Sequence, residues 1–321
     1  MRKLIVKIIA FNIPVLIIAA LLSRFDNLLF KVKNDNIIRI NEALHYNDPD
    51  YLFVGSSIAY SSIIPAFFDS INIRSYNLGI ATAGPYFMEI ILDDFLNAAK
   101  KKPENVVMEI SLLTFSDGSD DWVRYPVHRY LNRPLSNEYI AWHYGNLPLY
   151  LNMMRKSLVK GTRNIFEKTV YKNYDEYPYD TIALEEVVKN RGFYPSNEAL
   201  NDSVYRWQAA LMKDYPGKSF LPEKQQKLFR IIEKLQRAGC RVIIIEVPNS
   251  EFEHFFNVTY KNEYDNLLKT LSQTDNVTFI RQPPDAEGEY SFSEMRNITH
   301  LNTTGAKKFT KYLLKKLGEL N

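Results

Sequence analysis

The sequence has one cysteine and a nearly balanced charge, and each scarcity excludes a class of protein. The lone Cys240 excludes an internal disulfide framework and any metal site built from several cysteines. The net charge of +3 gives no strong basic field that would make nucleic acid the main ligand. Hydrophobic residues make up 46% and charged residues 24%, so disorder and low-complexity repeats are excluded for the bulk of the chain.

Histidine is also scarce, with five in the chain. His45, His143 and His254 have no neighbours at metal-ligand spacing, so we assign no metal. The segment 79–84 has neither the glycine spacing of a dinucleotide-binding loop nor an evident acid for the ribose. The sequence therefore predicts no cofactor.

Long apolar runs are absent except at the N-terminus. Arg2, Lys3 and Lys7 are followed by an apolar run from Ile8 to Leu22. Counted from Leu4, the segment approaches the roughly 20 residues that cross a hydrocarbon core. The positive flank predicts a cytoplasmic N-terminus and an exported remainder.

We interpret residues 1–24 as an uncleaved signal anchor. Two alternatives stay open. A cleaved signal peptide would use the small residues Ala19, Ala20 and Ser23, and a buried core helix would need no membrane. The favoured interpretation is a single-pass membrane protein whose main domain lies on the outer side, periplasmic or extracellular.

After a polar connector at residues 25–49, short apolar runs alternate with amphipathic helix patterns. The expected strands are 51–54, 73–78, 106–110, 242–247 and 277–280. Pro85 and Pro222 are expected to open helices, and Gly239 to close the second of them. Alternating units favour an α/β fold, a mostly parallel sheet with helices on both faces. Ligands of such sheets bind at the carboxyl ends of the strands.

Residues 116–220 interrupt this rhythm and hold all three tryptophans. A stretch of about 100 residues is too long for a simple loop. We expect a helical insertion that lies over the strand ends of a domain spanning 50–321. It is either a structural subdomain with its own aromatic core or a lid and sugar-stacking wall.

The insertion also holds the candidate substrate-binding residues Arg124, Arg129 and Trp122. With His128 and Arg133, the two arginines form a basic cluster interleaved with tyrosines. Such a cluster suits a phosphate-bearing or acidic glycan. A solvated, partly stacked surface is the alternative interpretation.

Three short segments at expected strand ends carry the candidate chemistry. Ser57 lies in Gly55-Ser56-Ser57, where a tight turn exposes its hydroxyl and backbone N–H groups can bind an oxyanion. Gly79 ends the second strand, where its backbone can approach a substrate oxygen. His300 precedes the final helix and could serve as general base to a serine.

These segments resemble the SGNH (GDSL-type) hydrolase and acyltransferase superfamily. More narrowly, the chain resembles its membrane-anchored branch of DltD-like and polysaccharide O-acetyltransferase-like proteins. The resembling residues are 54–57, 76–79 and 300–306, within about 50–115 and 222–320. The resemblance implies a three-layer, flavodoxin-like fold. It also implies that Ser57 is the nucleophile, that His300 is the base, and that Ser57 and Gly79 lend N–H groups to an oxyanion hole.

The sequence departs from the family at Asn297, where an aspartate commonly stands three residues before the histidine. The asparagine carbonyl can still orient the imidazole, but it cannot stabilise an imidazolium as a carboxylate does. The site then works as a weakened Ser57–His300 dyad, or another acid, Glu294 or Glu246, assists.

A second departure is in the third block, often Gly-x-Asn, where Ser111 would be the third oxyanion donor. The resemblance implies a serine-dependent esterase or acyltransferase for acyl groups of a cell-envelope polysaccharide or related polymer. A transferase would need a membrane partner that delivers the acyl group. The departures keep open an inactive protein of the same fold that binds glycan or assists polymer assembly.

Overall fold

The computed structural model describes residues 35–46, 48–116, 119–120, 181–213, 219–248, 252–281 and 290–319. These ranges all belong to one compact unit. The predicted anchor and the predicted substrate-binding residues Trp122, Arg124 and Arg129 lie outside them. In the described ranges, no helix has the length and apolarity needed to span a membrane.

A five-stranded parallel sheet forms the centre of this unit, in the order β2-β1-β3-β4-β5. The strands are β1 (Tyr51–Gly55), β2 (Ser75–Gly79), β3 (Asn105–Ile110), β4 (Arg241–Glu246) and β5 (Val277–Arg281). This order is the flavodoxin-like one. The predicted α/β class with a mostly parallel sheet is confirmed, and each expected strand forms within two residues of its expected bounds.

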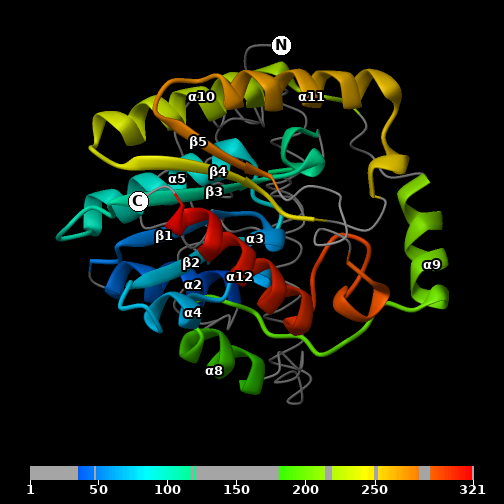
Figure 1. Ribbon diagram of the computed structural model, residues 1–321, viewed down its shortest axis with the longest axis horizontal. Helices are drawn as coiled ribbons and strands as arrows, with labels where there is room; N and C mark the ends of the chain where they lie inside the picture. The colour runs from blue at the N-terminus through cyan, green and yellow to red at the C-terminus, as the bar shows by residue number, and fades with distance from the viewer. Residues whose placement is uncertain are drawn as a thin grey trace, which may run out of the picture. The chain divides into compact units, whose positions relative to one another are not determined.

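Helices cover both faces of the sheet (Figure 1). One face carries α3 (Ser57–Ser62), α4 (Pro65–Asp69) and α12 (Thr303–Gly318), with α12 packed on both of the others. Crossover connections place α5 (Pro85–Ala98), α10 (Pro222–Arg237) and α11 (Val258–Ser272) on the other face, where α5 packs on α10. Short 3-10 helices follow several strands or precede helices: η1 (Leu112–Phe115), η3 (Phe252–Phe255) and η4 (Phe292–Glu294).

Proline and glycine mark several helix boundaries, as expected for Pro85, Pro222 and Gly239. Pro65, Pro85 and Pro222 open α4, α5 and α10, where a missing N–H costs nothing. Gly239, with φ +85°, lies just beyond the end of α10 in the left-handed conformation that favours glycine.

The core consists of the sheet and the inner faces of its helices. Every residue of β1, β2 and β3 is buried, which explains their nearly continuous apolar runs. Buried polar side chains begin β2 and β3, at Ser75 and Asn105, and two more lie further along these strands, Asn77 in β2 and Glu109 in β3. Both lie near the carboxyl ends of the strands, where ligands of such sheets bind.

The second half of the predicted connector belongs to the fold. Residues 35–45 form α2 (Asp35–His45), which packs on β2, α5 and α8. Its Arg39 is fully buried, donates from Nε to the Gly192 carbonyl at 2.8 Å and lies over the Tyr60 ring. The charged residues made this segment look like a connector, although one of them is a core residue.

Residues 181–213 and 219–220 of the predicted insertion also belong to the fold. They contain α8 (Thr181–Lys189) and α9 (Asp202–Lys213). Between these helices the chain covers the open edge of β2, where the Asn77 N–H donates to the Arg191 carbonyl at 2.9 Å. An edge strand with free backbone groups is thereby covered.

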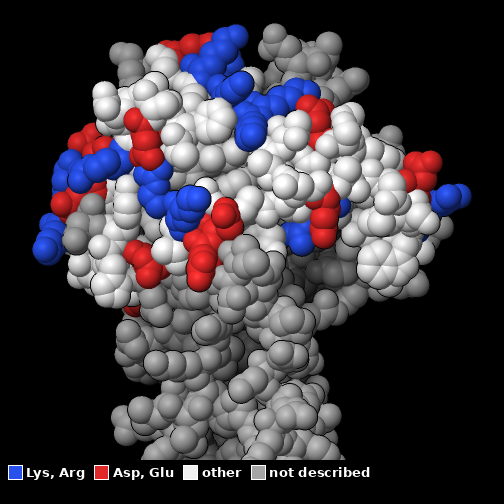
Figure 2. Space-filling view, turned by 90° about the horizontal axis from the view of Figure 1, so that it is seen from below, with Lys and Arg blue, Asp and Glu red and all other residues white. Residues whose placement is uncertain are grey.

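Charged side chains on the described surface are mixed in sign. On the face shown in Figure 2, basic and acidic side chains lie interspersed, in keeping with the small net charge. Pairing also links helices: Lys234 Nζ lies 3.0 Å from Glu89 Oε1 and 2.8 Å from Asp93 Oδ1, between α10 and α5. This face therefore presents no field of one sign.

Candidate active site

Ser57 is the first residue of α3, directly after the turn that ends β1. Ser56 is the N-cap of this helix, and its Oγ accepts the Ile58 N–H at 3.1 Å. Gly55 and Ser56 are buried, while Ser57 is partly exposed. The turn therefore places the candidate nucleophile at the carboxyl end of the sheet.

His300 comes from the loop before α12 and reaches Ser57. Its Nε2 lies 2.7 Å from Ser57 Oγ, and its Nδ1 lies 2.8 Å from Asn297 Oδ1. Thr299 Oγ1 also lies 2.8 Å from Nδ1. The structure thus brings the three predicted catalytic residues into one hydrogen-bonded line and adds Thr299. Thr299 is not among the residues predicted from the sequence, although a hydroxyl adjacent to the histidine was the available signal.

The hydrogen bonds of Asn297 decide which imidazole nitrogen carries the proton. Its Oδ1 also accepts the backbone N–H groups of Thr299 at 3.0 Å and His300 at 2.9 Å. Backbone N–H groups can only donate, so the atom facing His300 is the amide oxygen and not the nitrogen. That oxygen cannot donate, so Nδ1 must carry the proton. Nε2 then turns a lone pair to the Ser57 hydroxyl, as a general base requires.

The same surroundings make His300 a weak base. Burial of the imidazole, with a smaller contribution from the charge of Arg296, lowers the pKa of His300 from 6.5 to about 4. The imidazole is therefore neutral at pH 7 and can accept a proton. The imidazolium that would form is poorly stabilised, because Asn297 offers a dipole where a triad has a carboxylate.

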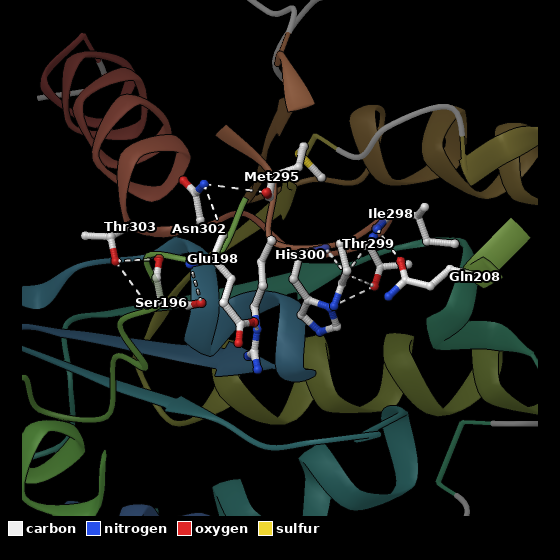
Figure 3. Close-up of polar contacts among 11 residues, drawn as sticks. Ser196, Glu198, Gln208, Met295, Ile298, Thr299, His300, Asn302 and Thr303 are labelled. Carbon is white, nitrogen blue, oxygen red and sulfur yellow. Dashed lines mark hydrogen bonds and ion pairs between the residues drawn. The ribbon is translucent and has the colours of Figure 1, made fainter. Parts of the chain in front are cut away.

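Two parts of the predicted insertion hold the loop that precedes α12 (Figure 3). The Ile298 N–H donates to Gln208 Oε1 of α9 at 3.1 Å. Asn302 Nδ2 donates to the Glu198 carbonyl at 3.1 Å, while its Oδ1 caps α12 by accepting the Gly305 N–H. The loop is thus fixed from both sides, which explains how one short sequence block keeps its histidine in place.

The two acids considered as helpers are engaged elsewhere. Glu294 accepts the N–H and O–H of Ser291 in a capping box. Glu246 Oε1 accepts the Tyr264 hydroxyl at 3.0 Å. In the described part of the chain, neither is a hydrogen-bond partner of the imidazole, so the hydrogen-bonded line ends at Asn297.

Gly79, a predicted oxyanion donor, has its N–H engaged within the protein. Its N–H donates to Asn77 Oδ1 at 3.0 Å. A Cβ at Gly79 would lie 2.6 Å from the Tyr60 nitrogen, so the glycine lets α3 approach β2. Asn77 Nδ2 in turn donates to the Ala59 and Ile63 carbonyls. The asparagine and the glycine therefore seat α3 on the sheet.

Ser111 also has a different place from the one predicted. It is buried, its N–H donates to Thr114 Oγ1 at 2.9 Å, and its hydroxyl lies 3.3 Å from the same atom. These contacts form the capping box at the start of η1 and engage the groups predicted for the oxyanion. The Ser57 N–H has no hydrogen-bond partner within the described ranges, so it stays the predicted oxyanion donor.

The described residues include no group of three or more His, Cys, Asp or Glu placed to hold a metal ion. Cys240 directly precedes β4, at the opposite end of the sheet from Ser57, and is buried. Burial raises the pKa of its thiol. It is therefore an unreactive core residue.

Neither a protein-family model nor a curated protein matches the chain. Among solved structures, it is similar to a Streptococcus pneumonia protein described as a candidate platelet activating factor. That match has 13% identity and a TM-score of 0.44, and covers 93% of this chain and 99% of that chain. A candidate acylhydrolase from Bacteroides fragilis matches with 12% identity and a TM-score of 0.42, over 87% and 94% of the two chains.

An acetyl xylan esterase from the rumen bacterium Butyrivibrio proteoclasticus matches with 10% identity and a TM-score of 0.33. The match covers 85% of this chain and 64% of that chain. Similarity at this level does not define an activity, which has to follow from the side chains at the strand ends.

Proposed function

We propose that the protein is a serine-dependent esterase or acyltransferase. The observation that carries the proposal is the hydrogen-bonded line from Ser57 through His300 to Asn297, with Nε2 as the proton acceptor. These residue types in this order are the nucleophile, the general base and the orienting group of acyl transfer.

The reaction follows from this geometry. Ser57 Oγ attacks the acyl carbonyl carbon as its proton passes to His300 Nε2. The carbonyl oxygen becomes an oxyanion, which the Ser57 N–H would bind. The imidazolium then gives its proton to the leaving alkoxide as the ester C–O bond breaks, and Ser57 is left acylated. Water or the hydroxyl of an acceptor releases the acyl group through the same proton transfers in reverse.

The proposed substrate is an acyl ester of a cell-envelope polysaccharide or related polymer, on the outer side of the membrane. Support comes from the basic flank and apolar run of residues 1–24, and from the tryptophan-containing insertion suited to sugar rings. Trp122, Arg124 and Arg129 are the proposed substrate-binding residues. Transfer in place of hydrolysis would require a membrane partner that supplies the acyl group.

Labelling with a fluorophosphonate probe, which reacts with activated serines, tests the proposal on the full-length protein. We expect one adduct on Ser57, located by peptide mass spectrometry and absent from Ser57→Ala. In His300→Gln the labelling rate should fall by roughly 10²-fold or more, the usual contribution of a general base. Ser61→Ala is the matched control, because the Ser61 hydroxyl only donates to the Ile58 carbonyl in the same helix. Equal labelling of the His300 variant would contradict the mechanism.

A folded wild-type protein that does not label would favour the second candidate function, a non-catalytic glycan-binding or assembly protein. Two observations favour it: Asn297 replaces a carboxylate, and Gly79 and Ser111 are bonded within the protein. Retention of the protein on immobilised envelope polysaccharide, unchanged in Ser57→Ala, would then be expected.

A further inference from the structure

Glu109 of β3 is a fully buried carboxyl beside the turn that carries the nucleophile. Its Oε2 accepts both the N–H and the O–H of Ser56, each at 2.8 Å. The same Ser56 hydroxyl oxygen accepts the Ile58 N–H. One carboxyl oxygen therefore fixes the backbone and the side chain of the residue directly before Ser57.

The chain leaves room for this carboxyl at Gly55. A Cβ built there would lie 2.7 Å from both Cβ and Oε2 of Glu109, and 2.9 Å from the Ala59 Cβ. Any side chain at Gly55 would therefore push the carboxyl away from Ser56. The first glycine of the Gly-Ser-Ser turn and the glutamate of β3 thus fit together as one unit.

Burying a carboxyl at this position is unfavourable for the free energy of folding. Burial raises the pKa of Glu109, while hydrogen bonds from the Ser56 backbone and side chain, and then from the Ser111 side chain, act in the opposite direction. Its Oε1 has no hydrogen-bond partner in the described part of the chain. An apolar side chain would fill the same space at lower cost. The carboxyl adds acceptor atoms, and Oε2 is the one that both donors of Ser56 reach.

We propose that Glu109 is a positioning residue for Ser57: its Oε2 holds Ser56 in the capping geometry that brings Ser57 Oγ within reach of His300 Nε2. The proposal deepens the proposed function and rests on it for the activity readout. The placement of Ser57 can also be measured without any activity.

Four variants of the full-length protein distinguish the loss of the acceptor atom from a change in side-chain volume and from a general loss of stability. Glu109→Gln keeps an acceptor oxygen for Ser56, whereas Glu109→Met keeps the length and removes it. Ser56→Ala removes the hydroxyl from the other side of the contact. Glu89→Met is the matched control, because Glu89 is a partly buried carboxyl of α5 that pairs with Lys227 at 2.8 Å and does not touch the turn.

The first readout is the fluorophosphonate labelling rate, divided into its maximal rate constant and its half-saturating probe concentration. In Glu109→Met we expect the maximal rate constant to fall roughly tenfold or more at unchanged half-saturation, as for a misplaced reacting group. Glu109→Gln should stay within about threefold of wild type, because the acceptor is kept. Glu89→Met should lower the unfolding temperature and leave both labelling constants unchanged.

The second readout is the ¹⁵N chemical shifts of the His300 imidazole, assigned by their loss in His300→Gln. In wild type, Nε2 should show the shift of a lone pair that accepts a hydrogen bond. In Glu109→Met that shift should move toward that of an unbonded nitrogen. This measurement reads the Ser57–His300 contact whether or not the protein turns over any ester.

The outcomes are distinct. Wild-type labelling and wild-type His300 shifts in Glu109→Met would overturn the proposal, and so would an equal loss of labelling in Glu89→Met. If wild type does not label but the Nε2 shift moves in Glu109→Met, the positioning role holds and the proposed function fails. If Glu109→Met does not fold, Ser56→Ala decides. The proposal expects a slower maximal rate and a shifted Nε2 signal in Glu109→Met.

Discussion

The imidazole of His300 lies between a hydroxyl and an amide oxygen, and the two neighbours have different consequences. Ser57 gives the imidazole a proton to take, and Asn297 fixes the tautomer that can take it. In serine proteases an Asp-to-Asn change lowers kcat about 10⁴-fold because the tautomer becomes wrong. Here the amide oxygen faces Nδ1, so the tautomer is right and only the charge is missing. The expected penalty is therefore smaller than the protease comparison suggests.

Asn297→Asp should restore the missing charge. The groups that donate to Oδ1, from Thr299 and His300, can all donate to a carboxylate as well. The new charge should raise the pKa of His300 and increase the labelling rate at pH 7 by roughly tenfold or more. Asn297→Ala, which loses the acceptor, should label more slowly than wild type. Slower labelling in the aspartate variant would show that charge is not what the site lacks.

The pH dependence of labelling should reveal the lowered pKa of His300. Because that pKa is about 4, the neutral base persists well below pH 6.5. We expect labelling to stay on its plateau through pH 6 and to reach half of it near pH 4. In Asn297→Asp the midpoint should move to higher pH. A wild-type midpoint near 6.5 would contradict the burial of the imidazole.

The stability of the fold should respond to the same group. Between pH 6.5 and 4 the unfolded chain binds a proton on His300 that the folded protein does not, so stability is lost as the pH falls through this window. Urea unfolding at pH 7 and pH 5 measures the loss, which should be smaller in His300→Gln. Equal pH dependence in the two proteins would show that His300 is not the responsible group.

At the scale of elements, the start of α12 is a tightly packed joint. A Cβ on Gly305 would lie 2.2 Å from the Glu294 carbonyl oxygen, so the helix can approach η4 only with glycine there. We expect Gly305→Ala to cost about 1–3 kcal/mol in the free energy of unfolding, as overpacked core positions do. The labelling rate should also fall, because α12 begins three residues after His300. Chemical denaturation and labelling of the same samples measure both effects.

Gly318→Ala is the matched control in the same helix. A Cβ there would meet nothing within 4 Å, so the unfolding free energy should stay within about 0.5 kcal/mol of wild type. A similar loss in both alanine variants would attribute the effect to helix chemistry and not to the contact with Glu294.

Most elements could be predicted from local patterns, because a buried parallel strand is an apolar run and a helix start often carries proline. Pro85 and Gly239 mark boundaries that the structure confirms. The features that local patterns did not predict share a cause, because each depends on contacts between segments distant in the sequence. Gly79 is a glycine because α3 lies against it, and Glu109 is a glutamate because Ser56 faces it. Arg39 is charged yet fully buried, which no local pattern indicates.

At the scale of the whole molecule, a buried lysine of α10 holds the segment that follows η1, at residues 116, 119 and 120. Lys224 is fully buried. Its Nζ donates to the Ser116 and Ser119 carbonyls and lies 3.5 Å from Asp120 Oδ2. The other carboxylate oxygen of Asp120 accepts the Gly84 N–H at the start of α5. This segment is therefore bound to α10 and to the start of α5, two helices on the same face of the sheet.

Lys224→Met should leave the Asp120 carboxylate buried without its cation. We expect a loss of about 3–5 kcal/mol in the free energy of unfolding, measured by urea denaturation. Arg237→Met is the control, because its pairing with Glu233 is exposed to solvent and should be worth about 0–1 kcal/mol. A small effect at Lys224 would show that its pairing with Asp120 contributes little to the stability of the fold.

The predicted anchor can be tested on the whole chain in bacterial cells. If residues 1–24 form an uncleaved anchor, the protein should stay in the membrane fraction after an alkaline wash, and its intact mass should include the N-terminal segment. Protease added to spheroplasts should then degrade the main domain, whereas a cytoplasmic control protein survives. A cleaved signal peptide would instead give an exported protein that begins near Ser23 and leaves the membrane fraction. A core helix would give a protein that is neither exported nor found in the membrane fraction. That result would also exclude the envelope polymer as substrate, because enzyme and polymer would lie on opposite sides of the membrane.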